Sequence, residues 1–263
     1  METPFDNDFC MILGARGSMP VGGQEFSHYG GATTCILLRL DGHYLILDAG
    51  TGILNLDPDI LSLPELHLIL THPHMDHLLG LGLFPYLFHE GKTLHVYADE
   101  MFGNTPQAFL EKLYNPPLWP AMLSSYPAEI ACHTLQHQNS INGITIETIH
   151  GVHPGGVSIV KASTGQHSVV LATDNTYTPD LCARLVPFAE GADLLLLDGQ
   201  YNDVEWEKKQ TYGHSTWSMA EAVGKACHAR QMRIIHHDPY RTDEELEDAG
   251  LSFGREWEMN ILD

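Results

Sequence analysis

Residues Leu66 to Gly80 read LHLILTHPHMDHLLG. The apolar run Leu66 to Leu70 predicts a buried strand, and a helix-like apolar run follows from Leu78. Polar side chains crowd the junction between the two runs, namely His72, His74, Asp76 and His77. Buried polar groups need partners, and histidine with aspartate is the ligand set expected for zinc and similar divalent ions. The stretch therefore predicts a metal site at the end of a strand.

A solvated, histidine-rich loop is the alternative interpretation of this stretch. Most scattered histidines are of that kind, and one histidine alone would carry little weight. The tight spacing H-x-H-x-D-H directly after a strand disfavours this alternative.

The composition is that of a globular protein in a reducing compartment. The 263 residues are 43% hydrophobic, and they contain no apolar run long enough to span a bilayer. The first ten residues, METPFDNDFC, are acidic and lack the apolar segment of a secretory signal, so we expect a cytoplasmic protein. The five cysteines are widely spaced and form no C-x-x-C pair, which predicts free thiols.

The charge balance bears on the partner. Asp and Glu number 34 against 13 Lys and Arg, which gives a formal charge of −21, and no basic cluster occurs. Long nucleic acids are held chiefly by cationic side chains, so a large nucleic acid is a poor partner for this chain. A small phosphorylated substrate remains compatible, because bound metal ions can supply local positive charge.

The same pattern recurs along the chain: an apolar strand ends, and His or Asp follows. It occurs at Asp48, at His72 to His77, and again at His153, Asp174, Asp198 and His236. Sites in layered α/β proteins collect where loops leave a rigid frame of strands. Without a linker or composition break, we expect a single domain over residues 1–263.

Two segments after the histidine motif receive specific predictions. Residues 78–89 are predicted as a helix, and residues 101–114 as another. The segment at about 101–128 is rich in proline and aromatic residues, which is typical of a lid or a dimer contact. Ordinary surface packing explains the segment at least as well.

The ordered motifs resemble the metallo-β-lactamase superfamily. Thr71-His-Pro-His-Met-Asp-His77 matches its defining motif, and His153-Pro-Gly-Gly, Ala-Thr-Asp174-Asn and His236 match the later ones. Gly213-His-Ser-Thr, followed after one helix by Ile-Ile-His-His-Asp-Pro, is most similar to the ribonuclease Z and cyclic phosphodiesterase branch. The resemblance implies an α+β fold, a four-layer αβ/βα sandwich with two divalent metal ions at its rim, zinc or manganese.

The resemblance also implies a ligand set. His72, His74 and His153 would hold the first metal, Asp76, His77 and His236 the second, with Asp174 bridging both. Two ions about 3.5–4 Å apart can share a hydroxide nucleophile and can bind a phosphoryl oxygen during in-line displacement. Asp76 and the other ligands would position that nucleophile. A bridging carboxylate offsets the repulsion between two dications.

His214 would act near the leaving group as a general acid or a phosphate contact. Asp198 takes the place of the acidic residue that orients this histidine in ribonuclease Z, shortened from Glu to Asp, although a turn role is an alternative. Asp48 is either an orienting partner for a ligand histidine or a turn-forming residue.

Several histidines stay outside the predicted site. The adjacent His237 competes with His236, and His150 with His153, for the ligand roles. The remaining histidines have no motif around them and are interpreted as surface or hydrogen-bonded core residues, namely His28, His43, His67, His89, His95, His133, His137, His167 and His228.

The predicted function is a dinuclear metal-dependent phosphodiesterase acting on a small phosphodiester, such as a cyclic nucleotide or a cyclic sugar phosphate. Transfer-RNA processing is disfavoured, because a basic Gly/Pro-rich insertion is missing and the charge is strongly negative. The family's usual Gly-Gly-Asn-Thr is Gly30-Gly-Ala-Thr33 here. Because a fold alone does not fix its chemistry, ester or lactone hydrolysis and nucleotide binding without catalysis are competing hypotheses. A homodimer is expected by analogy.

Overall fold

Two β-sheets lie face to face in the computed structural model, which describes residues 7–100 and 103–262. The first sheet has the strand order β13 (Glu258–Ile261), β1 (Phe9–Gly14), β2 (Cys35–Leu40), β3 (His43–Leu47), β4 (Glu65–Leu70), β5 (Thr93–Ala98) and β6 (Glu129–Thr134). The second has the order β12 (Gln231–Ile235), β11 (Leu194–Asp198), β10 (Ser168–Ala172), β9 (Ser158–Ser163), β8 (Ile144–His150) and β7 (Gln138–Ile141).

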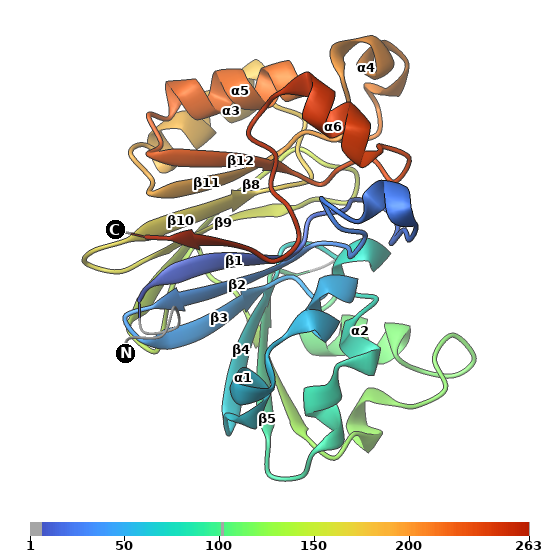
Figure 1. The fold of residues 1–263 in the computed structure, drawn as a ribbon. Coiled ribbons are helices and arrows are strands. Elements are labelled where there is room, and N and C mark those ends of the chain that lie inside the picture. Colours follow the sequence, from blue (N-terminus) through green and yellow to red (C-terminus); the bar gives the residue numbers. More distant parts are fainter. Residues whose placement is uncertain (1–6, 101–102, 263) are drawn as a thin grey trace.

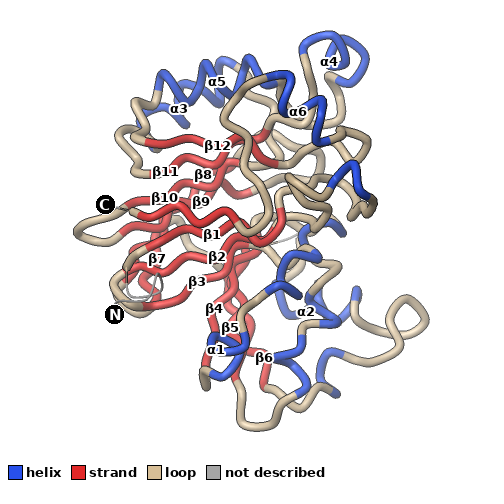
Figure 2. Tube along the Cα trace, viewed as in Figure 1, coloured by secondary structure: helices blue, strands red, loops and turns tan. Residues whose placement is uncertain are grey.

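Helices cover the outer faces of both sheets (Figures 1 and 2). The α-helices are α1 (Pro58–Ser62), α2 (Pro106–Leu113), α3 (Pro179–Phe188), α4 (Asp203–Lys209), α5 (Trp217–Ala226) and α6 (Asp243–Ala249). In the described part of the chain, no helix has the length and apolar character that crossing a membrane requires.

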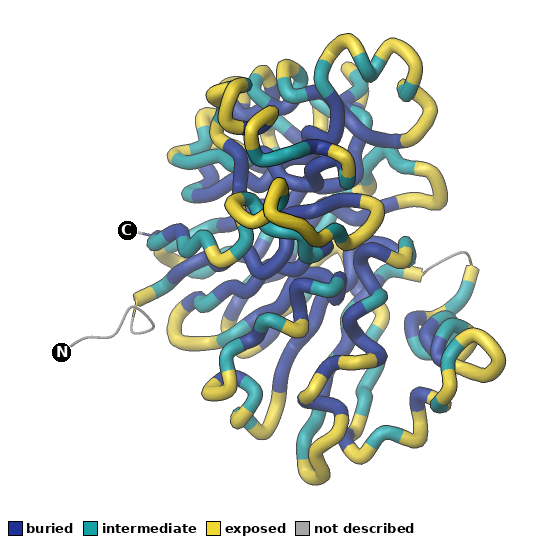
Figure 3. Tube along the Cα trace, turned by 45° about the vertical axis from the view of Figure 1, so that its right-hand side comes forward, coloured by how far each residue is buried: buried dark blue, intermediate teal, exposed yellow. Residues whose placement is uncertain are grey.

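Three apolar layers separate the four structural layers, and Figure 3 shows the buried chain running through the middle of the molecule. One layer joins α1 and α2 to the first sheet, one lies between the sheets, and one joins the second sheet to α3, α5 and α6. In β11, Leu194 and Leu196 face the layer between the sheets, whereas Leu195 and Leu197 face the helices. Burial on both faces explains its unbroken apolar run. The predicted four-layer αβ/βα sandwich is confirmed.

The helix predicted over residues 78–89 is wrong. The structure has short 3-10 turns instead, at Met75–His77, Leu81–Leu83 and Pro85–Phe88. A Cβ atom on Gly80 would lie 2.2 Å from the Gly50 carbonyl oxygen, so this segment runs too close to its neighbours for ordinary helix packing. Pro85 lacks the N–H that a continuing helix would use.

The remaining predictions for regular structure hold in part. The expected helix over 101–114 is α2, which begins at Pro106, and residues 101–102 lie outside the described residues. Sequence periodicity missed β7 and β13, which are short strands. All five cysteines are free, as predicted. The single domain, and the lid or dimer role of the segment at about 101–128, stay predictions.

The topology gathers the strand ends that carry His and Asp. β3, β4, β5 and β6 run parallel in the first sheet, and β10, β11 and β12 run parallel in the second. The carboxyl ends of parallel strands meet at one edge of their sheet. Asp48, His72, Asp174, Asp198 and His236 therefore arrive at the same rim.

Candidate metal centre

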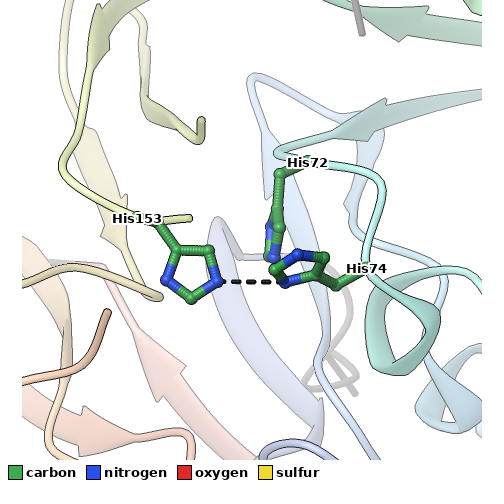
Figure 4. A group of neighbouring side chains, drawn as sticks. All are labelled: His72, His74 and His153. Atoms are coloured by element: carbon green, nitrogen blue, oxygen red, sulfur yellow. Dashed lines mark hydrogen bonds between the residues drawn. The ribbon is translucent and has the colours of Figure 1, made fainter. Parts of the chain in front are cut away.

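Three histidines form the first group of potential ligands at this rim. His72 and His74 lie in the segment that follows β4, and His153 lies in the loop after β8, as Figure 4 shows. One ligand atom from each residue lies within 4.8 Å of the others. The Nε2 atom of His153 lies 3.0 Å from Nδ1 of His74. Imidazole nitrogens that converge in this way can bind one cation.

A second group, fully buried, contains two carboxylates and two histidines. Its members are Asp76, His77, Asp174 and His236. The Nε2 atom of His236 lies 3.0 Å from Oδ2 of Asp76 and 3.1 Å from Oδ1 of Asp174. The Nε2 atom of His77 lies 3.1 Å from Oδ2 of Asp174. Mixed nitrogen and oxygen donors suit zinc or a similar divalent ion.

Asp174 lies between the two groups. Besides its contacts in the second group, its Oδ1 atom lies 3.7 Å from Nε2 of His72 and 3.8 Å from Nε2 of His153. Asp174 has a φ of 56° and His236 a φ of 63°, in the left-handed region that non-glycine residues rarely adopt. Such strain persists only where the surroundings hold it, and it clusters at functional sites.

The pKa values of the histidines in the first group are shifted in the opposite direction from that of His236 in the second. Burial lowers the pKa of His72 well below its usual value and also lowers the pKa values of His74 and His153. Burial acts in the same direction on His236, but Asp174 and Asp76 outweigh it and raise its pKa to about 9. The first group therefore presents neutral imidazoles, which are the form that binds metal.

The donor set fits a bound cation. The Nε2 atoms of His72 and His77 are buried and have no hydrogen-bond partner among the residues that the structure describes. A buried polar atom without a partner costs free energy, which a metal ion at this point would recover. The pKa of Asp174 lies well below its usual value, because the surrounding His236, His77 and His72 outweigh the effect of burial, so its carboxylate is ionised.

Neighbouring groups fix the orientation of the ligands. Asp48 accepts a hydrogen bond from Nδ1 of His77 at 2.8 Å and two more from Thr71, so the structure favours its orienting role over a turn role. The Gly213 carbonyl oxygen lies 2.8 Å from Nδ1 of His153. Such outer contacts set the tautomer and the direction of a ligand histidine.

The glycine-rich loop Gly14–Pro20 also contacts the site, which the sequence did not reveal. The backbone N–H of Ser18 donates a hydrogen bond to Oδ2 of Asp76 at 2.7 Å. A Cβ atom on Gly17 would lie 2.3 Å from Nδ1 of His236, so only glycine fits against that ring. The signal was the clustering of glycines, which suits a backbone that approaches something closely.

His214 and Asp198 form a pair beside both groups. Nδ1 of His214 lies 2.8 Å from Oδ2 of Asp198, and the other oxygen of Asp198 accepts from the Ser215 N–H at 2.9 Å. The His214 ring centre lies 5.0 Å from that of His153 and 4.9 Å from that of His236. Asp198 is therefore placed to orient His214.

The competing histidines lie elsewhere. Nε2 of His237 donates to the Gly254 carbonyl oxygen at 2.7 Å, away from both groups. The side chain of His150 is 67% exposed and lies 3.6 Å from Asp99. The structure thus gathers all seven predicted ligands with His214 and Asp198. Their roles as metal ligands stay predictions.

Comparison with known proteins identifies the family. The family model described as "Beta-lactamase superfamily domain" matches residues 43–237, which include every member of both groups and the His214–Asp198 pair. The chain belongs to the β-lactamase superfamily. The motifs predicted membership of this superfamily and of its ribonuclease Z-like branch, and both predictions are confirmed.

Relatives of this β-lactamase superfamily member align with it over most of their length. A curated ribonuclease Z from Agathobacter rectalis is 26% identical, with 88% of each chain aligned. The structure of the metallo-β-lactamase fold protein YhfI from Bacillus subtilis aligns with a TM-score of 0.72 at 19% identity, over 97% of this chain and 99% of that one. A diphosphatase of the PhnP family aligns with a TM-score of 0.73 at 17% identity, over 97% and 98%. The prediction that this superfamily member is a hydrolase is confirmed.

Proposed function

We propose that this chain is a dinuclear metal-dependent phosphodiesterase that hydrolyses a small phosphodiester. The observation that carries the proposal is the placement of His214, whose ring lies against ligand rings of both groups and is held by Asp198. A histidine so placed faces a substrate that spans both groups, and it is a proton donor in addition to the ligands.

The residues have separable tasks. Asp76, His77, Asp174 and His236 would hold one ion, and His72, His74 and His153 the other, with Asp174 between them. Bound divalent ions, zinc or manganese, supply Lewis acidity to the phosphoryl oxygens and activate the attacking water.

His214 serves the leaving group. With its Nδ1–H directed to Asp198, its Nε2 is free to face the substrate. As the bond from phosphorus to the leaving oxygen breaks, the protonated ring gives its Nε2 proton to that oxygen. Asp198 keeps the ring in this orientation during the transfer.

The charge of the chain supports a small substrate over a long nucleic acid. With 34 acidic and 13 basic residues, the chain offers little to a polyanion beyond the site itself. Arg16 and Arg241 are buried and engaged with backbone carbonyls or carboxylates. A cyclic nucleotide or a cyclic sugar phosphate meets this limit. A cytoplasmic location and a homodimer belong to the same proposal.

Transfer-RNA 3′ processing is the second candidate, because the curated relative from Agathobacter rectalis is named a ribonuclease Z. Ester or lactone hydrolysis is less favoured, because it does not explain the function of the His214–Asp198 pair. Nucleotide binding without turnover would leave that pair without a task as well.

Hydrolysis of bis-p-nitrophenyl phosphate by protein loaded with zinc or manganese tests the proposal. We expect turnover that depends on metal, falls strongly in His74→Ala, and is unchanged in His228→Ala, a matched change at an exposed histidine. A wild-type rate no faster than that of His74→Ala contradicts the proposal. Cleavage of a precursor transfer RNA together with inert cyclic diesters would favour the second candidate.

A further inference from the structure

A small apolar pocket lies beside the metal-binding motif. Its cavity of about 190 Å³ is lined by Met75, Leu79, Leu113, Tyr114, Leu118 and Trp119. Met75 stands between the ligands His74 and Asp76 in the sequence and is 50% exposed. One wall of the pocket is therefore the same turn that presents ligands to the cation.

Hydrogen bonds fix the opposite wall to that turn. The Tyr114 hydroxyl donates to the Leu78 carbonyl oxygen, and the Trp119 indole N–H donates to the Tyr126 hydroxyl at 2.9 Å. Tyr126 in turn donates to the Gly82 carbonyl oxygen at 2.7 Å. Hydrogen bonds within the chain thus hold the pocket walls in place.

Gly82 allows the aromatic rings to approach. A Cβ atom there would lie 2.4 Å from Cζ2 of Trp119 and 2.7 Å from Cε1 of Tyr114. Those two rings meet edge to face with their centres 5.3 Å apart. The close approach gives the pocket two aromatic walls whose positions are set by backbone contacts.

Charge is missing from the pocket walls. The lining side chains are all uncharged, and residues 113–128 contain no Asp, Glu, Lys, Arg or His in a chain of net charge −21. A phosphate or a sugar hydroxyl would find no polar partner among these side chains. An uncharged planar ring would gain from contact with the two aromatic walls.

We propose that this pocket binds an aromatic ester group of the substrate while the phosphate lies at the metal centre. The inference rests on the proposed function and names its substrate class: phosphodiesters with one aromatic substituent, a nucleobase or an aryl group. The pocket volume suits a single ring, whereas a stable protein partner needs a far larger surface.

Paired phosphonates test the pocket without any turnover. Isothermal titration of metal-loaded protein compares phenylphosphonate with methylphosphonate, which share the anionic head and differ only in the ring. Because the ring buries additional apolar surface, we expect phenylphosphonate to bind about ten-fold more tightly. Leu118→Ala, a change at a 75% exposed side chain in the pocket wall, should reduce that preference. Trp119→Leu should remove most of it.

Leu83→Ala is the matched control. Leu83 is 57% exposed, lies in the same segment as the motif and does not line the pocket, so its variant should keep the wild-type preference. Sedimentation of all variants is measured in parallel. Equal binding of both phosphonates, or a preference that survives in Trp119→Leu, overturns the inference.

A second copy of the chain as the occupant would give a different result. Leu118→Ala would then lower the sedimenting mass and leave the phosphonate ratio unchanged, which also overturns the inference. Failure of the proposed function is separate, because it appears as inert bis-p-nitrophenyl phosphate whatever the phosphonate ratio is.

Discussion

Two groups of histidines belong to the same sheet and have opposite surroundings. The metal-centre histidines that follow β4, namely His72, His74 and His77, lie at the strand end among carboxylates. The histidine column, which we define as His67, His95 and His133, lies within β4, β5 and β6. Residue type alone does not separate the two groups.

The two groups of histidines differ in their hydrogen bonds. In the histidine column, Nδ1 of His67 lies 3.2 Å from the Tyr97 hydroxyl and Nε2 lies 2.9 Å from the Asn142 amide. Nδ1 of His95 lies 3.1 Å from Nε2 of His133. At the metal centre, by contrast, the Nε2 atoms of His72 and His77 have no such partner within residues 7–100 and 103–262, and they face carboxylates. The comparison teaches that unpaired nitrogens near carboxylates, rather than histidine density, indicate a cation site.

The largest effect is expected from Asp174→Ala. This change removes the carboxylate that contacts both ligand groups, so the repulsion between two cations bound there would no longer be offset. We expect metal content to fall below one ion per chain and phosphodiesterase activity to fall to background. Elemental analysis with a parallel rate assay measures both. Retention of two ions would contradict a bridging role.

Matched histidine substitutions test the comparison itself. His74→Ala should lower activity by more than about 100-fold, beyond the loss typical of an outer-shell partner. His95→Ala, in the histidine column, should leave metal content and rate unchanged. If His95→Ala loses metal as His74→Ala does, the distinction drawn from hydrogen bonding is wrong.

His214→Ala should act on rate and spare metal binding. His214 supplies the leaving-group proton but is not needed to hold the ions, so we expect kcat to fall about 100-fold with two ions retained. Asp198→Asn should cost about 10-fold by loosening the orientation of His214. Loss of metal in either variant would assign the pair to the ligand set.

The smallest expected effect is on how folding stability depends on pH, through His67 of the histidine column. Burial, followed by the neighbouring His95, lowers the pKa of His67 to about 4 from an ordinary 6.5. The folded state therefore keeps His67 neutral while the unfolded chain takes up a proton, so stability falls as the pH drops from 6.5 towards 4.

His67→Gln measures this contribution, because glutamine cannot titrate. Between pH 6.5 and 4, we expect the free energy of unfolding of the wild type to fall by about 1–2 kcal/mol more than that of the variant. Chemical denaturation at several pH values gives both curves. Parallel curves would show that His67 does not resist protonation in the fold.

Much of the site was predictable because its residues follow apolar strands. His72, Asp174 and His236 each stand within two residues of the end of such a run, and parallel strands bring their ends to one rim. The pairing of Asp198 with His214 was implied by resemblance alone. It depends on a loop and helix α4 folding back, which no local pattern encodes.

Other features could not be read from the sequence, because they depend on approach between distant segments. The apolar run after Leu78 is helix-like by periodicity, yet Gly80 packs against the Gly50 carbonyl and the segment forms 3-10 turns. The contact of Ser18 with Asp76 joins residues 58 positions apart. The histidine column is likewise visible only once β4, β5 and β6 are paired.

An anomalous difference map from crystals grown with zinc would show where cations bind in this protein. We predict two peaks, one among His72, His74 and His153 and one among Asp76, His77 and His236, both within reach of Asp174. A map with no peak at this rim, or with zinc bound only between His95 and His133, would contradict the account.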